Sequence, residues 1–166
     1  MINVLKRDDT QEPIDYDKIH NILAFASEGL NISISQVEMN AKIQFYDGIP
    51  TADINTMLIK AASDLITAEE SDYAILAGRL LMFTVRKMAY GQHEPTPFLK
   101  HITGLTERGL YDKDILKDYS ADEINELESY IDHDKDLTFK FSGAKQLFAK
   151  YLLQSRVTGE VFESPQ

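Results

Sequence analysis

The sequence predicts a mainly α fold with a small β component (α+β), in which a short N-terminal β-ribbon lies over four helices and a further helical segment follows. Three observations support this prediction. Apolar residues recur at helical spacing in several windows, most clearly from Ile54 to Leu65. Capping-box patterns and glycines stand where these windows begin and end. Residues 1–14 carry instead two short extended runs around a polar turn, which is typical of paired strands.

The predicted ribbon covers residues 1–14. Ile2, Val4 and Leu5 form its first strand, Asp8-Asp9-Thr10 its turn, and residues 11–14 its return. Proline has no backbone N–H to donate, so Pro13 places the returning strand at a sheet edge.

Two helices are expected next. Asp15 or Asp17 caps the first helix, which ends near Gly29. Its apolar face consists of Ile19, Ile22, Leu23, Ala26 and Leu30. The second helix opens at one of two capping boxes, either Ser33 with Gln36 or Ser35 with Glu38, and stops at Asp47-Gly48. It is expected to carry Val37, Ala41, Ile43 and Phe45.

A third helix has Thr51 as its N-cap and Asp53 in its first turn. Its apolar positions are Ile54, Met57, Leu58, Ala61, Ala62 and Leu65. Thr67 and Glu70 form a possible capping box for a fourth helix, which ends near Gly91. Its apolar positions are Tyr73, Leu76, Ala77, Leu80, Phe83 and Met88.

Two prolines in residues 92–97 interrupt the helical pattern and mark a predicted boundary, giving domains at 1–91 and 92–166. Helices are expected over 98–108, 112–116 and 143–153. A capping box at Ser120 and Glu123 opens another helix, which carries Ile124, Leu127, Tyr130 and Ile131. Residues 156–162 predict a turn between extended pieces.

Composition narrows the possible functions. Lys and Arg total 17 against 27 Asp and Glu, which gives a formal charge of −10 and disfavours binding to a nucleic acid or an anionic membrane. There is no cysteine, so this chain carries no disulfide, thiolate metal site or thiol chemistry. The N-terminus has no apolar run typical of a signal peptide, and we expect a cytoplasmic location.

Four cations are the strongest candidates for a binding site: Lys6, Arg7, Lys18 and Lys87. If the ribbon lies near the N-termini of the first and third helices, these side chains and the N–H groups beside Thr51 could converge on a polyphosphate. The alternative is that all four are solvated surface cations, with Lys87 simply complementing a helix C-terminus.

Other candidates are weaker. His93, His101 and His133 do not have the spacing of metal ligands, and residues 133–136 are interpreted as a surface turn rather than a metal patch. The acid pairs at residues 8–9 and 69–70 fit a turn and a helix start. No metal or redox cofactor is predicted.

A family resemblance extends from residue 4 to residue 166. It is carried by VLKRD, IDYDKIHNIL, IQFYDGIPTADI, DYAILAGRLLMF, RKMAYGQHEP, IDHDKDLTF and RVTGEVFESPQ, in this order. These segments resemble the N-terminal part of the large (alpha) subunit of class I ribonucleoside-diphosphate reductase, beginning with its ATP-cone. The resemblance implies that residues 1–91 form the ATP-cone and that residues 92–166 begin the helical approach to a catalytic barrel, which is absent here.

The resemblance also implies a nucleotide site for ATP or dATP with Mg²⁺. Lys6, Arg7 and Lys87 would contact phosphates, with Thr51 nearby. Val4, Glu12, Ile14 and Asp15 would hold the adenine, and Lys18 would reach the nucleotide. Ile19, Phe25, Ile54 and Phe83 would form apolar walls, and Asp53 would help to distinguish ATP from dATP.

Three positions depart from the family pattern. Asp8-Asp9 replaces a common Asp-Gly turn, which Asp9 tolerates because aspartate adopts positive φ. Asn55 stands where a histidine commonly contacts the nucleotide, and Asp15 stands where an asparagine is common. The adenine and sugar contacts are therefore expected to differ more than the phosphate contacts.

The implied role is allosteric regulation of ribonucleotide reduction for DNA precursor synthesis, without the catalytic cysteines of the family. The implied partners are the rest of the large subunit, the radical-bearing small (beta) subunit and further large subunits. The chain would be a fragment or one piece of a split subunit. The alternative is a free-standing nucleotide-binding module that modulates a reductase, with Phe139, Phe141, Leu147, Tyr151 and Leu152 left exposed. A cone-bearing transcriptional repressor is disfavoured, because it requires a cysteine zinc ribbon and a basic surface.

Overall fold

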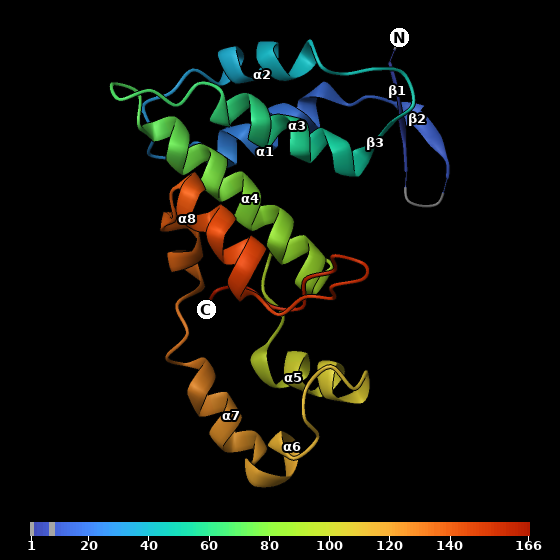
Figure 1. The fold of residues 1–166 in the computed structure, drawn as a ribbon, viewed down its shortest axis with the longest axis vertical. Coiled ribbons are helices and arrows are strands. Elements are labelled where there is room, and N and C mark those ends of the chain that lie inside the picture. The colour runs from blue at the N-terminus through green and yellow to red at the C-terminus, as the bar shows by residue number, and fades with distance from the viewer. Residues whose placement is uncertain (1, 7–8) are drawn as a thin grey trace. The chain divides into compact units, whose positions relative to one another are not determined.

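The computed structural model describes residues 2–6 and 9–166, in two compact units. The first comprises Met1–Leu81 with Thr138–Lys145, and the second comprises Met82–Leu137 with Gln146–Gln166. Helices predominate and a small sheet lies near the N-terminus, which confirms the predicted mainly α fold (Figure 1). Arg7 and Asp8, which the sequence analysis assigned to the phosphate site and to the turn, lie outside the described residues.

The sheet of the first unit has the order β2-β1-β3. Strands β1 (Asn3–Leu5) and β2 (Gln11–Pro13) pair antiparallel, and Asp9 in the connection has φ 62°, so the predicted ribbon is confirmed over its described residues. Strand β3 (Ile49–Pro50) pairs parallel with β1 and was not predicted, because a strand of two residues is too short to show alternation.

Helices α1 (Tyr16–Ala26) and α2 (Ile34–Lys42) follow the predicted order. Of the alternatives left open, Asp15 caps α1 and Ser33 caps α2, each accepting a hydrogen bond from the backbone N–H three residues later. The predicted end of α2 was wrong. The helix stops at Lys42, and Ile43 is 82% exposed, because residues 43–48 turn the chain toward β1, where Gly48 N donates to Asn3 O.

Helix α3 (Thr51–Ser63) begins directly after β3. The prediction of Thr51 as its N-cap was wrong by one residue: the cap is Pro50, with φ −61° and ψ 139°, and no side chain caps this end. Pairing with Leu5 keeps Pro50 extended, so the helical conformation starts at Thr51.

Helix α4 (Asp72–Tyr90) ends as predicted at Gly91, which has φ 73°. Its predicted start was wrong: Thr67 Oγ1 does accept a hydrogen bond from Glu70 N, but this bond closes a turn ahead of the helix. Within the first unit Gly78 packs against the chain before α8 (Phe141–Gln146), so closely that a Cβ there would lie 2.1 Å from Phe139 O.

The core of the first unit is apolar. Buried side chains from the sheet and the helices fill it: Val4, Ile19, Leu23, Val37, Ile49, Ile54, Leu58, Tyr73, Leu76 and Leu80. The Tyr73 hydroxyl donates to Gln36 Oε1 and accepts from Ser33 N, which ties the start of α4 to the start of α2. Most predicted core positions are therefore confirmed, although Met88 of α4 is exposed.

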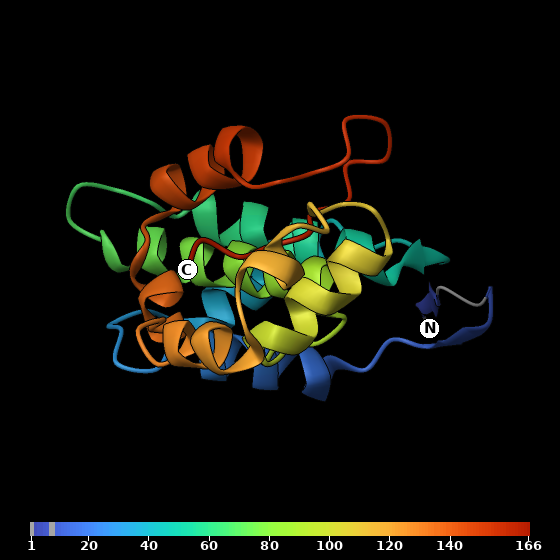
Figure 2. The ribbon, with the colours of Figure 1, turned by 90° about the horizontal axis from the view of Figure 1, so that it is seen from below.

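The second unit contains α5 (Phe98–Glu107), α6 (Ile115–Asp118), α7 (Ala121–Glu128), a 3₁₀ helix (His133–Thr138) and a π-helical turn (Leu147–Tyr151). The α5 helix and the capping box of Ser120 with Glu123 are confirmed. Helices α5 and α7 lie side by side (Figure 2).

Three predictions for this unit were wrong in extent. The helix predicted over 112–116 begins only at Ile115, because the Asp112 side chain accepts from Asp114 N and holds a turn. Helix α7 ends at Glu128, before Tyr130 and Ile131. The helix predicted over 143–153 is divided between α8 and the π-helical turn, which ends at Tyr151.

The C-terminal tail confirms the predicted turn between extended pieces. Gln154 and Val161 form an antiparallel bridge, and Gly159 has φ 72°. Leu152, Val161 and Phe162 are buried and Tyr151 is exposed, so Leu152 does not have the exposure that the free-standing alternative implied for it.

Residues 133–136 are not the predicted surface turn. Asp136 is 0% exposed and forms an ion pair with Arg86, which is 5% exposed, with 3.1 Å between Arg86 Nη2 and Asp136 Oδ2. Arg86 Nη2 also donates to His133 O. The sequence around Asp136 gave no indication of this ion pair, because Arg86 lies 50 positions earlier in the chain.

Candidate functional site

The end of β1 lies beside the start of α3. Leu5 of β1 pairs with Pro50 of β3. Lys6 follows Leu5, and Thr51, the first residue of α3, follows Pro50. No side chain caps α3, and the N–H groups of its first turn are thus suited to an anion. Lys6 Nζ lies 2.7 Å from Glu12 Oε1, which holds the lysine side chain on the β1–β2 ribbon.

The other end of β1 lies beside the start of α1. Ile14 N donates to Ile2 O, and Asp15 follows as the cap of α1. Lys18 N donates to Asp15 Oδ1 at 3.0 Å, and this hydrogen bond lowers the pKa of the Asp15 carboxyl. Lys18 Nζ is 3.5 Å from Asp15 Oδ2. At about 3.3 Å per residue, these groups are separated from Lys6 and Thr51 by about 10 Å of strand.

The predicted apolar contacts are of two kinds. Val4, Ile19 and Ile54 are buried and belong to the core of the first unit. Phe25, in contrast, is 61% exposed on α1. On α3, Asp53 is exposed in the first turn and Asn55 is half-buried.

Phe83 and Lys87 lie one turn apart on the part of α4 that belongs to the second unit. Phe83 is buried and Lys87 is exposed. The His93 ring packs edge-on against Phe83, with 5.7 Å between ring centroids and an interplanar angle of 75°. The sequence pattern offers His93 only as a possible metal ligand and does not connect it with Phe83.

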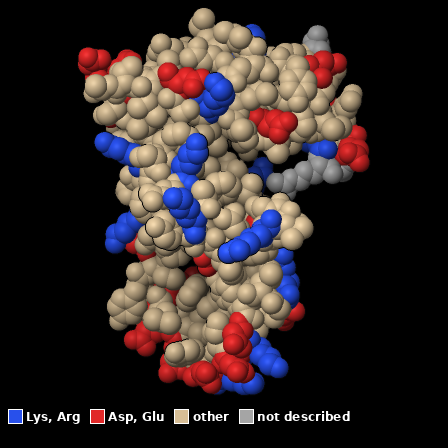
Figure 3. All heavy atoms as spheres, in the orientation of Figure 1, with Lys and Arg blue, Asp and Glu red and all other residues tan. Residues whose placement is uncertain are grey.

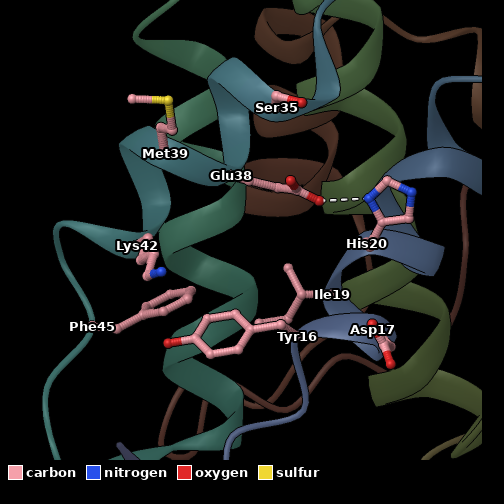
Figure 4. A pocket seen from close by; sticks show the side chains of 9 residues that line it. All are labelled: Tyr16, Asp17, Ile19, His20, Ser35, Glu38, Met39, Lys42 and Phe45. Carbon is pink, nitrogen blue, oxygen red and sulfur yellow. Dashed lines mark hydrogen bonds and ion pairs between the residues drawn. The ribbon is translucent and has the colours of Figure 1, made fainter.

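A hollow of about 400 Å³ lies between α1 and α2 in the first unit (Figure 4). His20 Nδ1 and Glu38 Oε1 are 2.7 Å apart across it, and Lys42 Nζ lies 5.1 Å from the centre of the Tyr16 ring. Among the described residues, Ile19 is the predicted contact residue that lines this hollow, and it does so together with Tyr16, Asp17, His20, Ser35, Glu38, Met39, Lys42 and Phe45. The hollow was not predicted from the sequence. Its lining comes mainly from α1 and α2, and no local sequence pattern shows which faces of these two helices pack together.

Charge on the surface is unevenly distributed. Carboxylates gather over α6 and α7 of the second unit, where residues 111–128 hold many acids and few lysines (Figure 3). Within residues 2–6 and 9–166, no three His, Asp or Glu side chains are grouped to hold a metal ion. No helix in this same part of the chain is long and apolar enough to cross a membrane.

Known proteins similar in sequence to this chain identify its family. The ATP cone domain family model matches residues 2–88. The chain is 52% identical to ribonucleoside-diphosphate reductase 1 subunit alpha of Escherichia coli (strain K12) over 164 residues, covering 98% of this chain and 22% of that protein. It is 43% identical over 166 residues to the ribonucleoside-diphosphate reductase subunit alpha of Enterobacteria phage T4, again covering 22% of the relative. A relative from Synechocystis with the same subunit name is 29% identical over 166 residues. The chain thus spans about a fifth of the length of the curated relatives that it matches.

Proposed function

We propose that this chain, which belongs to the ATP-cone family, binds an adenine nucleotide through residues 2–88 as an allosteric effector. The observation that carries the proposal is the family match over these residues, since it includes every predicted contact from Val4 to Lys87. No reaction is assigned to the site, and its function is to couple nucleotide binding to subunit assembly.

The proposed nucleotide lies along β1. Lys6 and the amide groups at Thr51 bind the phosphates at the α3 end, and the family resemblance adds Arg7 and Lys87 as phosphate contacts. Val4, Glu12, Ile14 and Asp15 hold the adenine toward the α1 end, and Lys18 supports it. The separation of Asp15 and Lys18 from Lys6 and Thr51 supports this orientation, because a nucleotide is an extended molecule with its charge at one end, while Glu12, paired with Lys6, lies between the two ends.

We further propose that the regulated enzyme is a class I ribonucleoside-diphosphate reductase, of whose large subunit this chain is the N-terminal region. ATP favours the active assembly with the radical-bearing small subunit, and dATP favours an inhibited one. Each nucleotide shifts the equilibrium by its differential affinity for the two assemblies. Asp53 and Asn55, at the start of α3, contribute to distinguishing the two sugars. The effector binds as its Mg²⁺ complex.

Titration calorimetry with ATP and with dATP in Mg²⁺ tests nucleotide binding. Lys6→Ala and Lys87→Ala are each expected to weaken binding by about tenfold or more, because each removes a charge-assisted hydrogen bond to phosphate. Lys113→Ala, an exposed lysine outside the site, is the matched control and should bind as the unaltered chain does. Absence of heat with both nucleotides, from a chain shown to be folded by circular dichroism, contradicts the proposal.

A further inference from the structure

We infer that His93 is a further contact of the bound effector, whose imidazolium form donates a hydrogen bond to the phosphate chain beside Lys87. The inference rests on the proposed function, because it requires a nucleotide at Lys87. It adds a residue outside the predicted contact set and makes effector binding dependent on pH.

The chain after α4 returns His93 to the helix face that carries Phe83 and Lys87. Gly91 N donates to Lys87 O at 3.1 Å, and the positive φ of Gly91 reverses the chain direction. Gln92 Nε2 then donates to Glu94 O at 2.9 Å and closes the loop around His93. The His93 ring ends edge-on against Phe83. One side of the imidazole is therefore held in place, while the side chain as a whole is exposed.

Partial burial and the charges around His93 favour its neutral form in the free chain. Desolvation lowers the pKa of His93 first, the Lys87 ammonium lowers it further, and the Arg86 guanidinium adds to this effect. Glu94 opposes them and raises the pKa. Arg86 is already paired with Asp136, so Lys87 is the cationic neighbour of His93 that a phosphate can approach.

A bound triphosphate reverses this balance. Negative charge beside Lys87 favours the imidazolium, so the pKa of His93 rises when the nucleotide binds, and binding takes up a proton. A group whose pKa is higher in the complex strengthens binding fully at pH values below its pKa in the free chain. That gain is lost as the pH rises through its pKa in the complex.

The simpler alternative is that His93 only covers the Phe83 ring. His93→Phe separates these roles, because phenylalanine keeps an aromatic ring against Phe83 but has no nitrogen to protonate or donate. His20→Gln is the matched control, since His20 is an exposed histidine that pairs with Glu38 away from α4.

Titration calorimetry with ATP in excess Mg²⁺, at pH 6.0, 7.0 and 8.0 and in two buffers of different ionisation enthalpy, measures affinity and proton uptake together. The unaltered chain and His20→Gln are expected to bind about tenfold more weakly at pH 8.0 than at pH 6.0, with proton uptake near pH 7, as for one hydrogen bond to a charged group. His93→Phe should lose both the pH dependence and the proton uptake. NMR titration of the His93 ring should show its pKa rise on adding ATP.

The possible outcomes distinguish a failure of the His93 contact from a failure of nucleotide binding by the chain. If His93→Phe binds ATP with the affinity, pH dependence and proton uptake of the unaltered chain, His93 is not a contact, and the proposed function stands. If the folded chain binds no ATP at any pH, both the proposed function and this inference are overturned.

Discussion

The two units of the molecule differ in where they place their polar groups. Among the described residues, the buried polar side chains are Arg86, Asp136 and Ser164, and all three belong to the second unit. In the first unit the ion pairs are largely exposed, as for Lys6–Glu12 and Lys60–Asp64. The first unit is therefore stabilised by apolar packing and keeps its cations at the surface, where a ligand can reach them.

The second unit instead joins distant segments through polar side chains. The Tyr90 hydroxyl lies 2.8 Å from Ser164 Oγ, and the Tyr111 hydroxyl donates to Glu163 Oε2 at 2.9 Å. Desolvation raises the pKa of both tyrosines, so they stay neutral and keep their protons for these bonds. The short helices of this unit offer little continuous apolar surface, and each of these bonds therefore matters more to its stability.

The largest effect is expected at the buried ion pair. Asp136→Asn leaves Arg86 buried without its carboxylate, which should lower the free energy of unfolding by about 3–5 kcal/mol. Urea denaturation followed by circular dichroism measures this change. Asp134→Asn, at an exposed position of the same 3₁₀ helix, should change stability by less than about 0.5 kcal/mol.

A double substitution tests why the pair matters. Arg86→Met with Asp136→Leu removes both charges and should recover most of the stability lost in Asp136→Asn, because no charge is then buried alone. A loss below about 1 kcal/mol in Asp136→Asn would remove the contrast between the two units, since it would match the value of an exposed pair.

The next largest effect is expected in the packing of the first unit. Gly78→Ala places a Cβ 2.1 Å from Phe139 O, a backbone atom that cannot move alone, so we expect a loss of about 1–3 kcal/mol by urea denaturation. Gly104→Ala in α5 meets nothing within 4 Å and should stabilise the chain by about 0.5–1 kcal/mol through helix propensity. Equal effects at the two glycines would contradict the close packing at Gly78.

A smaller effect is expected from acid on the second unit. Desolvation lowers the pKa of His101, although its hydrogen bond to Phe162 O and the nearby Glu163 act in the opposite direction. The unfolded chain then binds the proton more readily, so stability is fully present above about pH 6.5 and falls as the pH drops through that value.

His101→Gln should flatten this dependence, because glutamine can still donate to Phe162 O but does not titrate. Urea denaturation at pH 7.5, 6.5 and 5.5 compares the two proteins. An unchanged slope with pH in the variant would assign the acid sensitivity to another group.

Sequence reasoning succeeded where the signal is local. The Ser120 cap, the glycine end of α4 and the existence of the ribbon follow from side-chain chemistry within a few residues, and the Asp15 and Ser33 caps were each one of two local alternatives. It failed where the deciding partner is distant. Strand β3 exists because β1 pairs with it, α2 ends where the chain turns toward that pairing, and Asp136 is buried because Arg86 meets it.

The candidate site shows the same division. Lys6 was a candidate from the sequence, but its position beside the start of α3 depends on the pairing of Leu5 with Pro50, which no periodicity indicates. His93 had no signal as a site residue, because its relation to Phe83 arises from the reversal at Gly91. The nucleotide contacts themselves remain predictions from the family resemblance.

The smallest effect is expected at an exposed ion pair of the first unit. Lys60 Nζ lies 2.6 Å from Asp64 Oδ2 on α3, yet both side chains are in contact with water, which weakens their attraction and allows salt to screen it. Lys60→Ala should therefore change the free energy of unfolding by less than about 0.5 kcal/mol, and the difference should shrink further in 1 M salt. Urea denaturation at low and high salt provides the measurement. A loss comparable with that of Asp136→Asn would show that the first unit also depends on charge pairing, and the distinction between the two units would then rest on the Gly78 packing alone.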